Sequence, residues 1–165
     1  MTNLRIGFGF DVHELSEGVD FNLGGIIVPH KKGSVGHSDA DVLIHAICDA
    51  LLGAANLGDI GKIFPDSDSK YKNIDSKILL KDVLKLLVDK NYSIVNIDST
   101  ICLQVPKLSE YIPMMKVVLS ECLGIRTDLL SIKATTTEKL GFVGKEEGVS
   151  SYATVLIQKS KWFIV

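Results

Sequence analysis

The sequence of 165 residues lacks the features that mark several specialised classes of protein. It has no basic excess, since 18 Lys and Arg face 20 Asp and Glu for a net charge of −2, so we expect no nucleic-acid partner. No apolar run reaches the ~18 residues that a membrane span needs, so we expect no membrane partner. The start, MTNLRIGF, lacks the charged head and apolar core of a signal peptide, which predicts a cytoplasmic protein.

Cysteine is also scarce. Cys48, Cys102 and Cys122 are odd in number and have no CxxC spacing, which argues against a disulfide framework. All three lie in apolar segments, which predicts buried free thiols in a reducing compartment. No linker, low-complexity tract or internal repeat divides the chain, so its length predicts one domain.

Hydrophobic periodicity predicts both strands and helices. Helical spacing of apolar residues predicts a helix capped by Ser38 or Asp39, an amphipathic helix over 75–90 and a third over 109–123. Six segments are predicted as strands, the second and third of them joined as a hairpin: 4–13, 21–23, 26–29, 92–105, 129–137 and 148–159. This order predicts an α+β domain, with a mixed sheet and helices packed on one face.

The predicted strand 92–105 bears on assembly. Its polar face carries one formal charge, Asp98. If helices cover one face of the sheet, the other face is left open. A weakly charged open face can be buried against another copy of the chain as readily as it can be exposed to water. The sequence therefore leaves room for an oligomer built on the sheet.

Candidate metal ligands occur in the run GFGFDVHEL near the N-terminus. Asp11 and His13 lie two apart on a predicted strand, so their side chains share one face, the face that the glycines leave bare. The helix downstream offers Asp41, His45 and Asp49 along one stripe. An Asp-x-His pair with a distant His suits Zn²⁺ with an open fourth position. The alternative is that His45 is a surface helix residue and Asp11 caps a turn.

Two further runs have residues suited to phosphate chemistry. In HSD, His37 and Ser38 can donate to a phosphate at a helix N-terminus. The alternative is that Ser38 is an ordinary helix cap and His37 has no role. In KATTTEKLGF, the threonines and Glu138 are hard oxygen ligands suited to Mg²⁺, although a capping box from Thr135 to Glu138 is an alternative. Lys107, in QVPKL, is either a phosphate contact or a solvated lysine.

Together these motifs resemble one family. The runs DVH, HSDADVLIHAICDALLGAANLGDIG, FPDSD, QVPK and KATTTEKLGFVG have the order and spacing of the 2-C-methyl-D-erythritol 2,4-cyclodiphosphate synthases of the non-mevalonate isoprenoid pathway. The resemblance extends from about Arg5 to Lys159, so we expect a synthase domain over 1–159 and a short C-terminal tail over 160–165.

The resemblance implies a metal-dependent lyase reaction within one molecule. The 2-phosphate of 4-diphosphocytidyl-2-C-methyl-D-erythritol 2-phosphate attacks its own β-phosphate, which gives 2-C-methyl-D-erythritol 2,4-cyclodiphosphate and CMP. Because the substrate supplies both reacting groups, no enzyme nucleophile is needed, and the chain has no convincing nucleophile–base pair. The resemblance also implies a homotrimer, with the sheets toward the three-fold axis and the sites between subunits.

The resemblance further implies roles for individual residues. Asp11, His13 and His45 match the zinc ligands, and Glu138 matches the ligand of a second ion, Mg²⁺ or Mn²⁺. His37 and Thr136 match the residues that stabilise the transition state. The implied substrate-binding positions run from the phosphate end through the erythritol loop to the cytidine diphosphate pocket: Asp11, Val12, His13, His37, Ser38, Asp59, Ile60, Gly61, Phe64, Pro65, Asp66, Ser67, Asp68, Leu103, Gln104, Val105, Pro106, Lys107, Leu108, Ser109, Ala134, Thr135, Thr136, Thr137, Glu138, Phe142 and Lys145.

One residue departs from the family pattern, and two alternative functions remain open. Lys145 stands where the family usually has Arg, which keeps the charge but loses the bidentate fork. A zinc-dependent phosphohydrolase would use the same triad with an activated water and release CMP with a linear diphosphate. A non-enzymatic protein would hold a structural zinc or bind an isoprenoid phosphate as a trimer.

Overall fold

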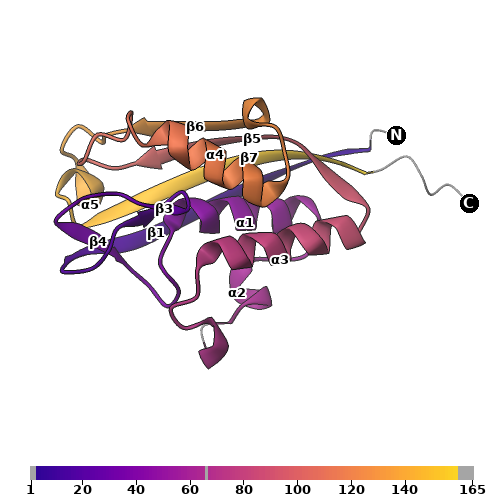
Figure 1. Cartoon of the computed structure of the whole chain (residues 1–165), viewed down its shortest axis with the longest axis horizontal. Helices are drawn as coiled ribbons and strands as arrows, with labels where there is room; N and C mark the ends of the chain where they lie inside the picture. Colours follow the sequence, from indigo (N-terminus) through magenta and orange to yellow (C-terminus); the bar gives the residue numbers. More distant parts are fainter. Residues whose placement is uncertain (1–2, 66, 160–165) are drawn as a thin grey trace, which may run out of the picture.

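A five-stranded sheet with the order β4-β1-β7-β5-β6 forms the centre of the fold (Figure 1). The computed structural model describes residues 3–65 and 67–159, so the predicted site residue Asp66 and the predicted tail 160–165 lie outside the described residues. Only β5 and β6 run parallel among the neighbouring strands of this sheet, which confirms the predicted mixed sheet. Its strands are β1 (Leu4–Glu17), β4 (Lys32–Val35), β5 (Tyr92–Cys102), β6 (Leu130–Thr135) and β7 (Gly148–Lys159).

Three long helices pack on one face of this sheet, as predicted: α1 (Val42–Ala54), α3 (Ser76–Asp89) and α4 (Ile112–Leu123) (Figure 1). Helix α1 lies against β1 and β7, α3 packs on α1, and α4 lies over β6. The shorter elements lie in the connections: the hairpin β2 (Asn22–Leu23) and β3 (Ile26–Ile27), the helices α2 (Ile60–Ile63) and α5 (Gly141–Gly144), and the 3₁₀ turns Ser69–Tyr71 and Thr127–Leu129.

The start of helix α1 differs from the prediction. Its N-cap is Asp41, whose carboxylate accepts hydrogen bonds from the amides of Leu43 and Ile44 at 3.2 and 3.1 Å. The same carboxylate accepts from Gly24 and Gly25 at 3.0 and 2.7 Å, which ties the β2–β3 turn to the helix. Ser38 and Asp39, the predicted caps, do not occupy the N-cap position because α1 begins at Val42.

The strands lie mostly where they were predicted, but their first and last residues differ from the prediction. Strand β1 continues to Glu17, four residues past its predicted end, because it pairs with both β7 and β4. Strand β4 was not predicted, since KGSV is short and mostly polar. Strand β5 ends at Cys102 rather than residue 105, and a bulge at Val95 shifts its register against β7.

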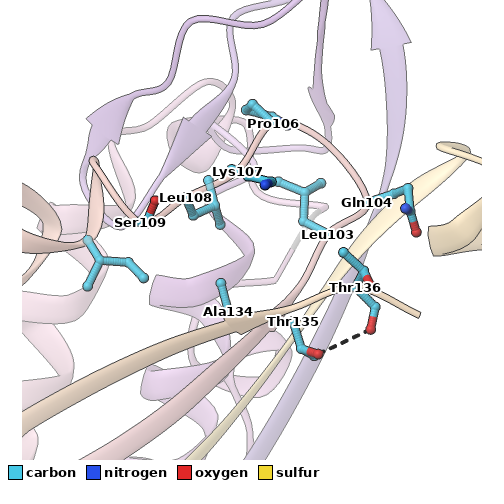
Figure 2. Close-up of a pocket in the computed structure, with 10 residues that line it drawn as sticks. Leu103, Gln104, Pro106, Lys107, Leu108, Ser109, Ala134, Thr135 and Thr136 are labelled. Carbon is cyan, nitrogen blue, oxygen red and sulfur yellow. Dashed lines mark hydrogen bonds between the residues drawn. The ribbon is translucent and has the colours of Figure 1, made fainter. Parts of the chain in front are cut away.

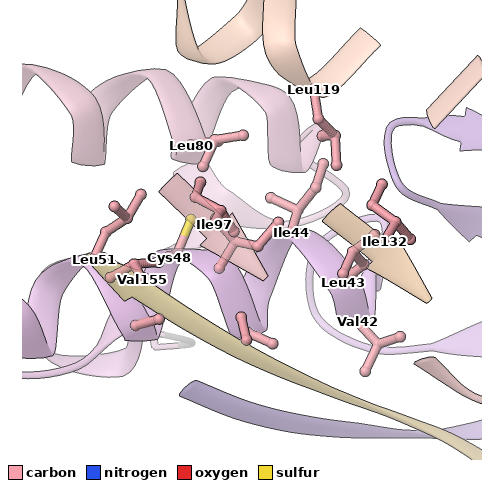
Figure 3. Close-up of a cluster of buried hydrophobic side chains, with 14 of the residues drawn as sticks. Val42, Leu43, Ile44, Cys48, Leu51, Leu80, Ile97, Leu119, Ile132 and Val155 are labelled. Atoms are coloured by element: carbon pink, nitrogen blue, oxygen red, sulfur yellow. The ribbon is translucent and has the colours of Figure 1, made fainter. Parts of the chain in front are cut away.

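The hydrophobic core fills the space between the sheet and the three helices (Figure 3). Ile44 and Cys48 of α1 lie between Val155 of the sheet and Leu80 of α3, all with less than 1% of their surface exposed. Helix α1 is therefore buried on nearly every side, so its predicted polar stripe does not face solvent. All three cysteines are free thiols in the described part of the chain, and Cys48 is the fully buried one.

The open face of the sheet is more apolar than the sequence analysis predicts. Ile6 and Phe8 of β1 are 72% and 65% exposed, and Tyr152 of β7 lies beside Phe8 and Phe10. Asp98, the one charge expected on this face, pairs with Lys133 of β6 at 2.6 Å. We name as the β1 stripe the exposed residues of this strand and its neighbour: Leu4, Ile6, Phe8, Phe10, Val12 and Tyr152. Within residues 3–65 and 67–159, no helix has the length and apolar character to cross a membrane.

Candidate active site

Strand β1 and helix α1 lie in direct contact because glycines of the strand face the helix. A Cβ atom added to Gly9 would lie 2.0 Å from the carbonyl oxygen of Ala46, a distance that no side chain tolerates. The glycine two residues earlier is equally close to the next turn of the helix. This approach brings His45 of α1 to Asp11 and His13, the next residues on the same face of β1.

The three side chains converge on one point. Asp11 Oδ2 lies 3.0 Å from His13 Nε2 and 2.9 Å from His45 Nδ1, and the two nitrogens are 3.1 Å apart. The ligands of a tetrahedral zinc ion, with bonds of about 2.0 Å, are about 3.3 Å apart, so this donor set fits such an ion. Among the described residues, this is the only group of His, Cys, Asp or Glu that meets the spacing of a metal site.

Replacing Gly9 with alanine is expected to separate β1 from α1. The added methyl group has backbone on its far side, so the helix must move, and we expect a loss of about 3 kcal/mol in the free energy of unfolding together with weaker metal binding. Gly53→Ala is the matched control, because a Cβ atom there meets nothing within 4 Å and alanine favours a helix by up to about 1 kcal/mol. Urea unfolding and zinc titration of both variants test this, and equal behaviour would contradict the close-contact argument.

Electrostatics keep the carboxylate of this cluster ionised. Burial alone raises the pKa of Asp11, but hydrogen bonds and charge from His13 and His45 outweigh it, and the net shift lowers the pKa. Burial alone lowers the pKa of His45, but the hydrogen bond and negative charge of Asp11 raise this pKa, and the net shift is upward. Asp11 is therefore charged and available as a ligand at neutral pH.

The other two acidic residues of the α1 stripe have structural roles. Asp41 is completely buried, and its carboxylate accepts backbone amides, as described above. Asp49 accepts the amide hydrogen of Ile60 at 2.7 Å and so holds the start of α2 against α1. Only His45 of the stripe joins the metal cluster. It is buried, with 9% of its surface exposed, so the alternative of a surface histidine is wrong.

A hollow of about 280 Å³ opens in front of the metal cluster. His37 and Ser38 line it, but not as the N-terminus of a helix, because Asp41 already satisfies the first amides of α1. Asp59 caps α2 beside it by accepting the amide hydrogen of Lys62 at 2.8 Å. The lining residues come from both predicted and unpredicted positions: Asp11, His13, Gly36, His37, Ser38, His45, Ile60, Gly61, Phe64, Tyr71 and Leu79.

A second hollow, of about 270 Å³, lies where β5 and β6 end (Figure 2). Nine of its ten lining residues are predicted cytidine-side contacts; Ile112, the first residue of α4, was missed because an apolar helix residue has no distinguishing sequence signal. The predicted contacts gathered here are Leu103, Gln104, Pro106, Lys107, Leu108, Ser109, Ala134, Thr135 and Thr136.

A tight turn follows this second hollow. The Thr136 hydroxyl donates to Glu138 Oε1 at 2.9 Å, and Glu138 and Lys139 have left-handed φ values of 52° and 64°. Gln104 Oε1 accepts the amide hydrogen of Lys139 at 3.3 Å. The next helix, α5, begins only at Gly141, so the capping box from Thr135 to Glu138 is wrong.

The remaining predicted contacts line neither hollow. The Val12 side chain lies on the open face of the sheet, away from its neighbours Asp11 and His13. Phe142 of α5 packs against Gly148, which is paired with β1 one residue past His13. These predicted contacts in the described residues are Val12, Asp59, Pro65, Ser67, Asp68, Val105, Thr137, Glu138, Phe142 and Lys145.

The two hollows are separate in one chain. Their described lining residues do not overlap, and β7 and β5 lie between β1 and β6 in the sheet. Three strand spacings of about 4.8 Å amount to about 14 Å. The metal cluster therefore lies beside β1 and the first hollow, whereas Thr136 lines the second hollow just past the end of β6.

Two residues behind the metal cluster were not predicted as part of the site. Ser76, the first residue of α3, lies 2.9 Å from His45 Nε2, and Asp39 accepts hydrogen bonds from Ser76. Both contacts join segments far apart in the sequence, so no local pattern indicates them.

Comparison with known proteins gives a consistent result. The model of the YgbB family matches residues 4–158. The 2-C-methyl-D-erythritol 2,4-cyclodiphosphate synthase of Bacteroides fragilis is 64% identical over 156 residues, which cover 94% of this chain and 98% of the relative. The enzyme of the same name from Porphyromonas gingivalis (strain W83) is 60% identical over 153 residues, 93% of this chain and 94% of the relative.

Solved structures agree with these relatives. The bifunctional IspDF of Campylobacter jejuni superposes with a TM-score of 0.94 at 39% identity; the match covers 98% of this chain and 44% of that longer chain. IspF of Plasmodium falciparum, in a CDP complex, gives a TM-score of 0.84 at 33% identity over 97% of this chain and 99% of that one. The chain therefore belongs to the YgbB family, together with these 2-C-methyl-D-erythritol 2,4-cyclodiphosphate synthases.

Proposed function

We propose that this protein converts 4-diphosphocytidyl-2-C-methyl-D-erythritol 2-phosphate into 2-C-methyl-D-erythritol 2,4-cyclodiphosphate and CMP. The convergence of Asp11, His13 and His45 beside a hollow lined by His37 and Ser38 carries the proposal. The curated relatives bear the name of this synthase at up to 64% identity. We further propose that residues 1–159 form the catalytic domain, and the free thiols support a reducing, cytoplasmic location.

We propose that the cluster holds Zn²⁺ and that Glu138 holds a second ion, Mg²⁺ or Mn²⁺. Two imidazoles and one carboxylate are a typical catalytic zinc set. A single carboxylate beside substrate phosphates is a common Mg²⁺ arrangement. The Thr136 hydroxyl orients the carboxylate of Glu138. When bound, the ions supply positive charge that polarises the diphosphate.

The residues of this chain then bind and orient the substrate. His37 and Ser38 flank the metal cluster and can donate to phosphoryl oxygens as charge develops on them. Thr136 is the corresponding donor at the nucleotide end once its hydroxyl hydrogen turns from Glu138 to the substrate, and Lys107 lies in the cytidine hollow. Holding both reacting phosphates of one molecule in attack geometry contributes up to about 7–11 kcal/mol, so no protein nucleophile is required.

We propose that the protein is a homotrimer whose sheets face the three-fold axis. The β1 stripe supports this assembly, because so large a group of exposed aliphatic and aromatic side chains is typical of an interface. The separation of the two hollows supports sites shared between subunits. The metal cluster would then come from one subunit and the Thr136–Glu138 turn from its neighbour.

Replacing Phe8 with aspartate is expected to dissociate the trimer. Phe8 is 65% exposed in the single chain, so the fold tolerates the change, whereas burying a carboxylate at the centre of the interface costs several kcal/mol. Val88→Asp is the matched control, because Val88 is 60% exposed but lies on α3, away from the sheet. Native mass spectrometry and light scattering give the outcome; an assembly unaffected by Phe8→Asp would contradict the proposed interface.

Phosphorus NMR tests the proposed reaction directly. The protein is incubated with the diphosphocytidyl substrate, Zn²⁺ and Mg²⁺, and we expect the resonances of CMP and a cyclic diphosphate. CMP with a linear diphosphate would instead indicate a phosphohydrolase. Unchanged substrate, with zinc bound to a folded protein, would reject catalysis of this substrate.

A further inference from the structure

Both ring nitrogens of His45 have hydrogen-bonding partners in the structure. Its Nδ1 atom faces Asp11 and His13, whereas its Nε2 atom lies 2.9 Å from the hydroxyl of Ser76 and 3.1 Å from that of Ser38. Ser76 has none of its surface exposed, and it belongs to α3 rather than to an element that carries a metal ligand. A buried hydroxyl in this position requires a defined set of hydrogen bonds.

Asp39 defines the direction of those bonds. Its Oδ2 atom accepts the amide hydrogen of Ser76 at 3.0 Å, and its Oδ1 atom accepts the Ser76 hydroxyl. An ionised carboxylate only accepts, so the Ser76 hydrogen points to Asp39 and a lone pair of its oxygen remains for His45. Nε2 of His45 must therefore be the donor toward Ser76, which leaves Nδ1 as the nitrogen that can bind a metal between it and Asp11.

This arrangement selects one form of the histidine. A neutral imidazole has its proton on either nitrogen, and only the nitrogen without it can bind a metal. The atom left free here is Nδ1, the one that faces Asp11 and His13. Ser38 does not impose this choice, because its hydroxyl accepts the amide hydrogen of Ala40 at 3.3 Å and keeps a rotatable hydrogen.

We propose that Ser76 and Asp39 are positioning residues that fix the ring orientation of His45 and hold its Nε2 proton for metal binding. The inference rests on the proposed function in taking Asp11, His13 and His45 as the metal ligands. Partners of this kind behind a ligating histidine typically contribute 10–100-fold to metal affinity. The hydrogen bonds from His45 to Ser76 and from Ser76 to Asp39 also join the start of α3 to the metal cluster. The packing of α3 on α1 therefore helps to set the position of the His45 ring.

Zinc affinity and the hydrogen bond of His45 Nε2 test the proposal in the full-length protein. Dissociation constants come from competition with a chelator, and the hydrogen bond of His45 Nε2 in the zinc-bound protein comes from ¹⁵N NMR of the imidazoles. Ser76→Ala is expected to weaken zinc binding about 10–100-fold and to shift the Nε2 resonance of His45. Ser120→Ala is the matched control, since Ser120 is also a buried helix serine, but it bonds only to the carbonyl of Val117 within α4. It should leave both readouts unchanged.

Asp39→Asn provides a second variant, in case Ser76→Ala unfolds. An amide can donate to the Ser76 hydroxyl, which frees the hydroxyl hydrogen to point to His45, so we again expect weaker zinc binding and a shifted Nε2 resonance. Wild-type zinc affinity and an unshifted Nε2 resonance in the folded variants would overturn the inference. Absence of zinc binding in the wild type would instead reject the metal site of the proposed function.

Discussion

Replacing His45 with alanine is expected to abolish zinc binding and to lower the rate of cyclisation by a factor on the order of 10³ or more. His45 Nδ1 is within 3.1 Å of both other ligand atoms, so its removal leaves Asp11 and His13 as a two-ligand site. Two ligands hold zinc weakly, and the charge that polarises the diphosphate is then missing from the site. Elemental analysis of the purified variant and its turnover by phosphorus NMR give the two readouts.

Controls separate this effect from loss of the fold. His45 is buried, so the variant also creates a cavity, and its circular dichroism and melting temperature must show a folded protein. His30→Ala is the matched substitution, because the His30 ring bonds only to the backbone of Lys32 and lies outside both hollows. It should keep full zinc and activity. Full zinc occupancy in folded His45→Ala would reject the ligand assignment.

The sequence predicted the pairing of Asp11 with His13 for a reason that the structure confirms. Alternation on a strand is a local rule, and it places both side chains on one face without any knowledge of the fold. The third ligand could not be obtained in this way. Three residues of the α1 stripe were equally spaced; a preference for histidine and the family resemblance indicated His45, and the contact between α1 and β1 is what brings His45, rather than Asp41 or Asp49, to the cluster.

Strand β1 also shows why its faces could not be assigned from the sequence. Alternating strands usually turn their apolar side chains to the core. Here Ile6 and Phe8 face away from the helices, while Gly7 and Gly9 face α1. The inversion follows from the close approach of the helix, which leaves no room for a side chain. The apolar stripe on the open face was accordingly missed, and the prediction of an oligomer rested on the weakly charged polar face of the strand predicted over 92–105 instead.

Other errors arose where the sequence offered several equivalent residues. The run HSDAD contains three good capping residues, and only the fold shows that Ser38 bonds to the His45 ring and Asp39 to Ser76, instead of to the first amides of α1. The capping box at Thr135 failed for a similar reason, because the Thr136 hydroxyl bonds to Glu138 within a turn instead of starting a helix. The cytidine hollow was predicted well, since family resemblance identified a contiguous run that the structure brings together.

Two inactive variants are expected to restore activity when they are folded together. In the proposed trimer, each site takes its metal cluster from one subunit and Glu138 from the next. His45→Ala and Glu138→Ala chains are each expected to be inactive alone, because each lacks one half of every site. In a random trimer of equal amounts, a Glu138→Ala chain supplies the metal half and a His45→Ala chain the other half at about one quarter of the interfaces.

The expected activity of the mixture is therefore about one quarter of wild type, from two samples that have almost none. The variants are mixed unfolded, refolded together and examined by native mass spectrometry, with tags of different mass that report mixed trimers. Folding each variant separately and mixing afterwards is the control, and it should restore nothing while subunits do not exchange. Mixed trimers without activity would mean that both halves of a site come from one chain. The two hollows of a single chain lie beside β1 and β6, strands about 14 Å apart across the sheet, and this separation is the reason to expect the opposite.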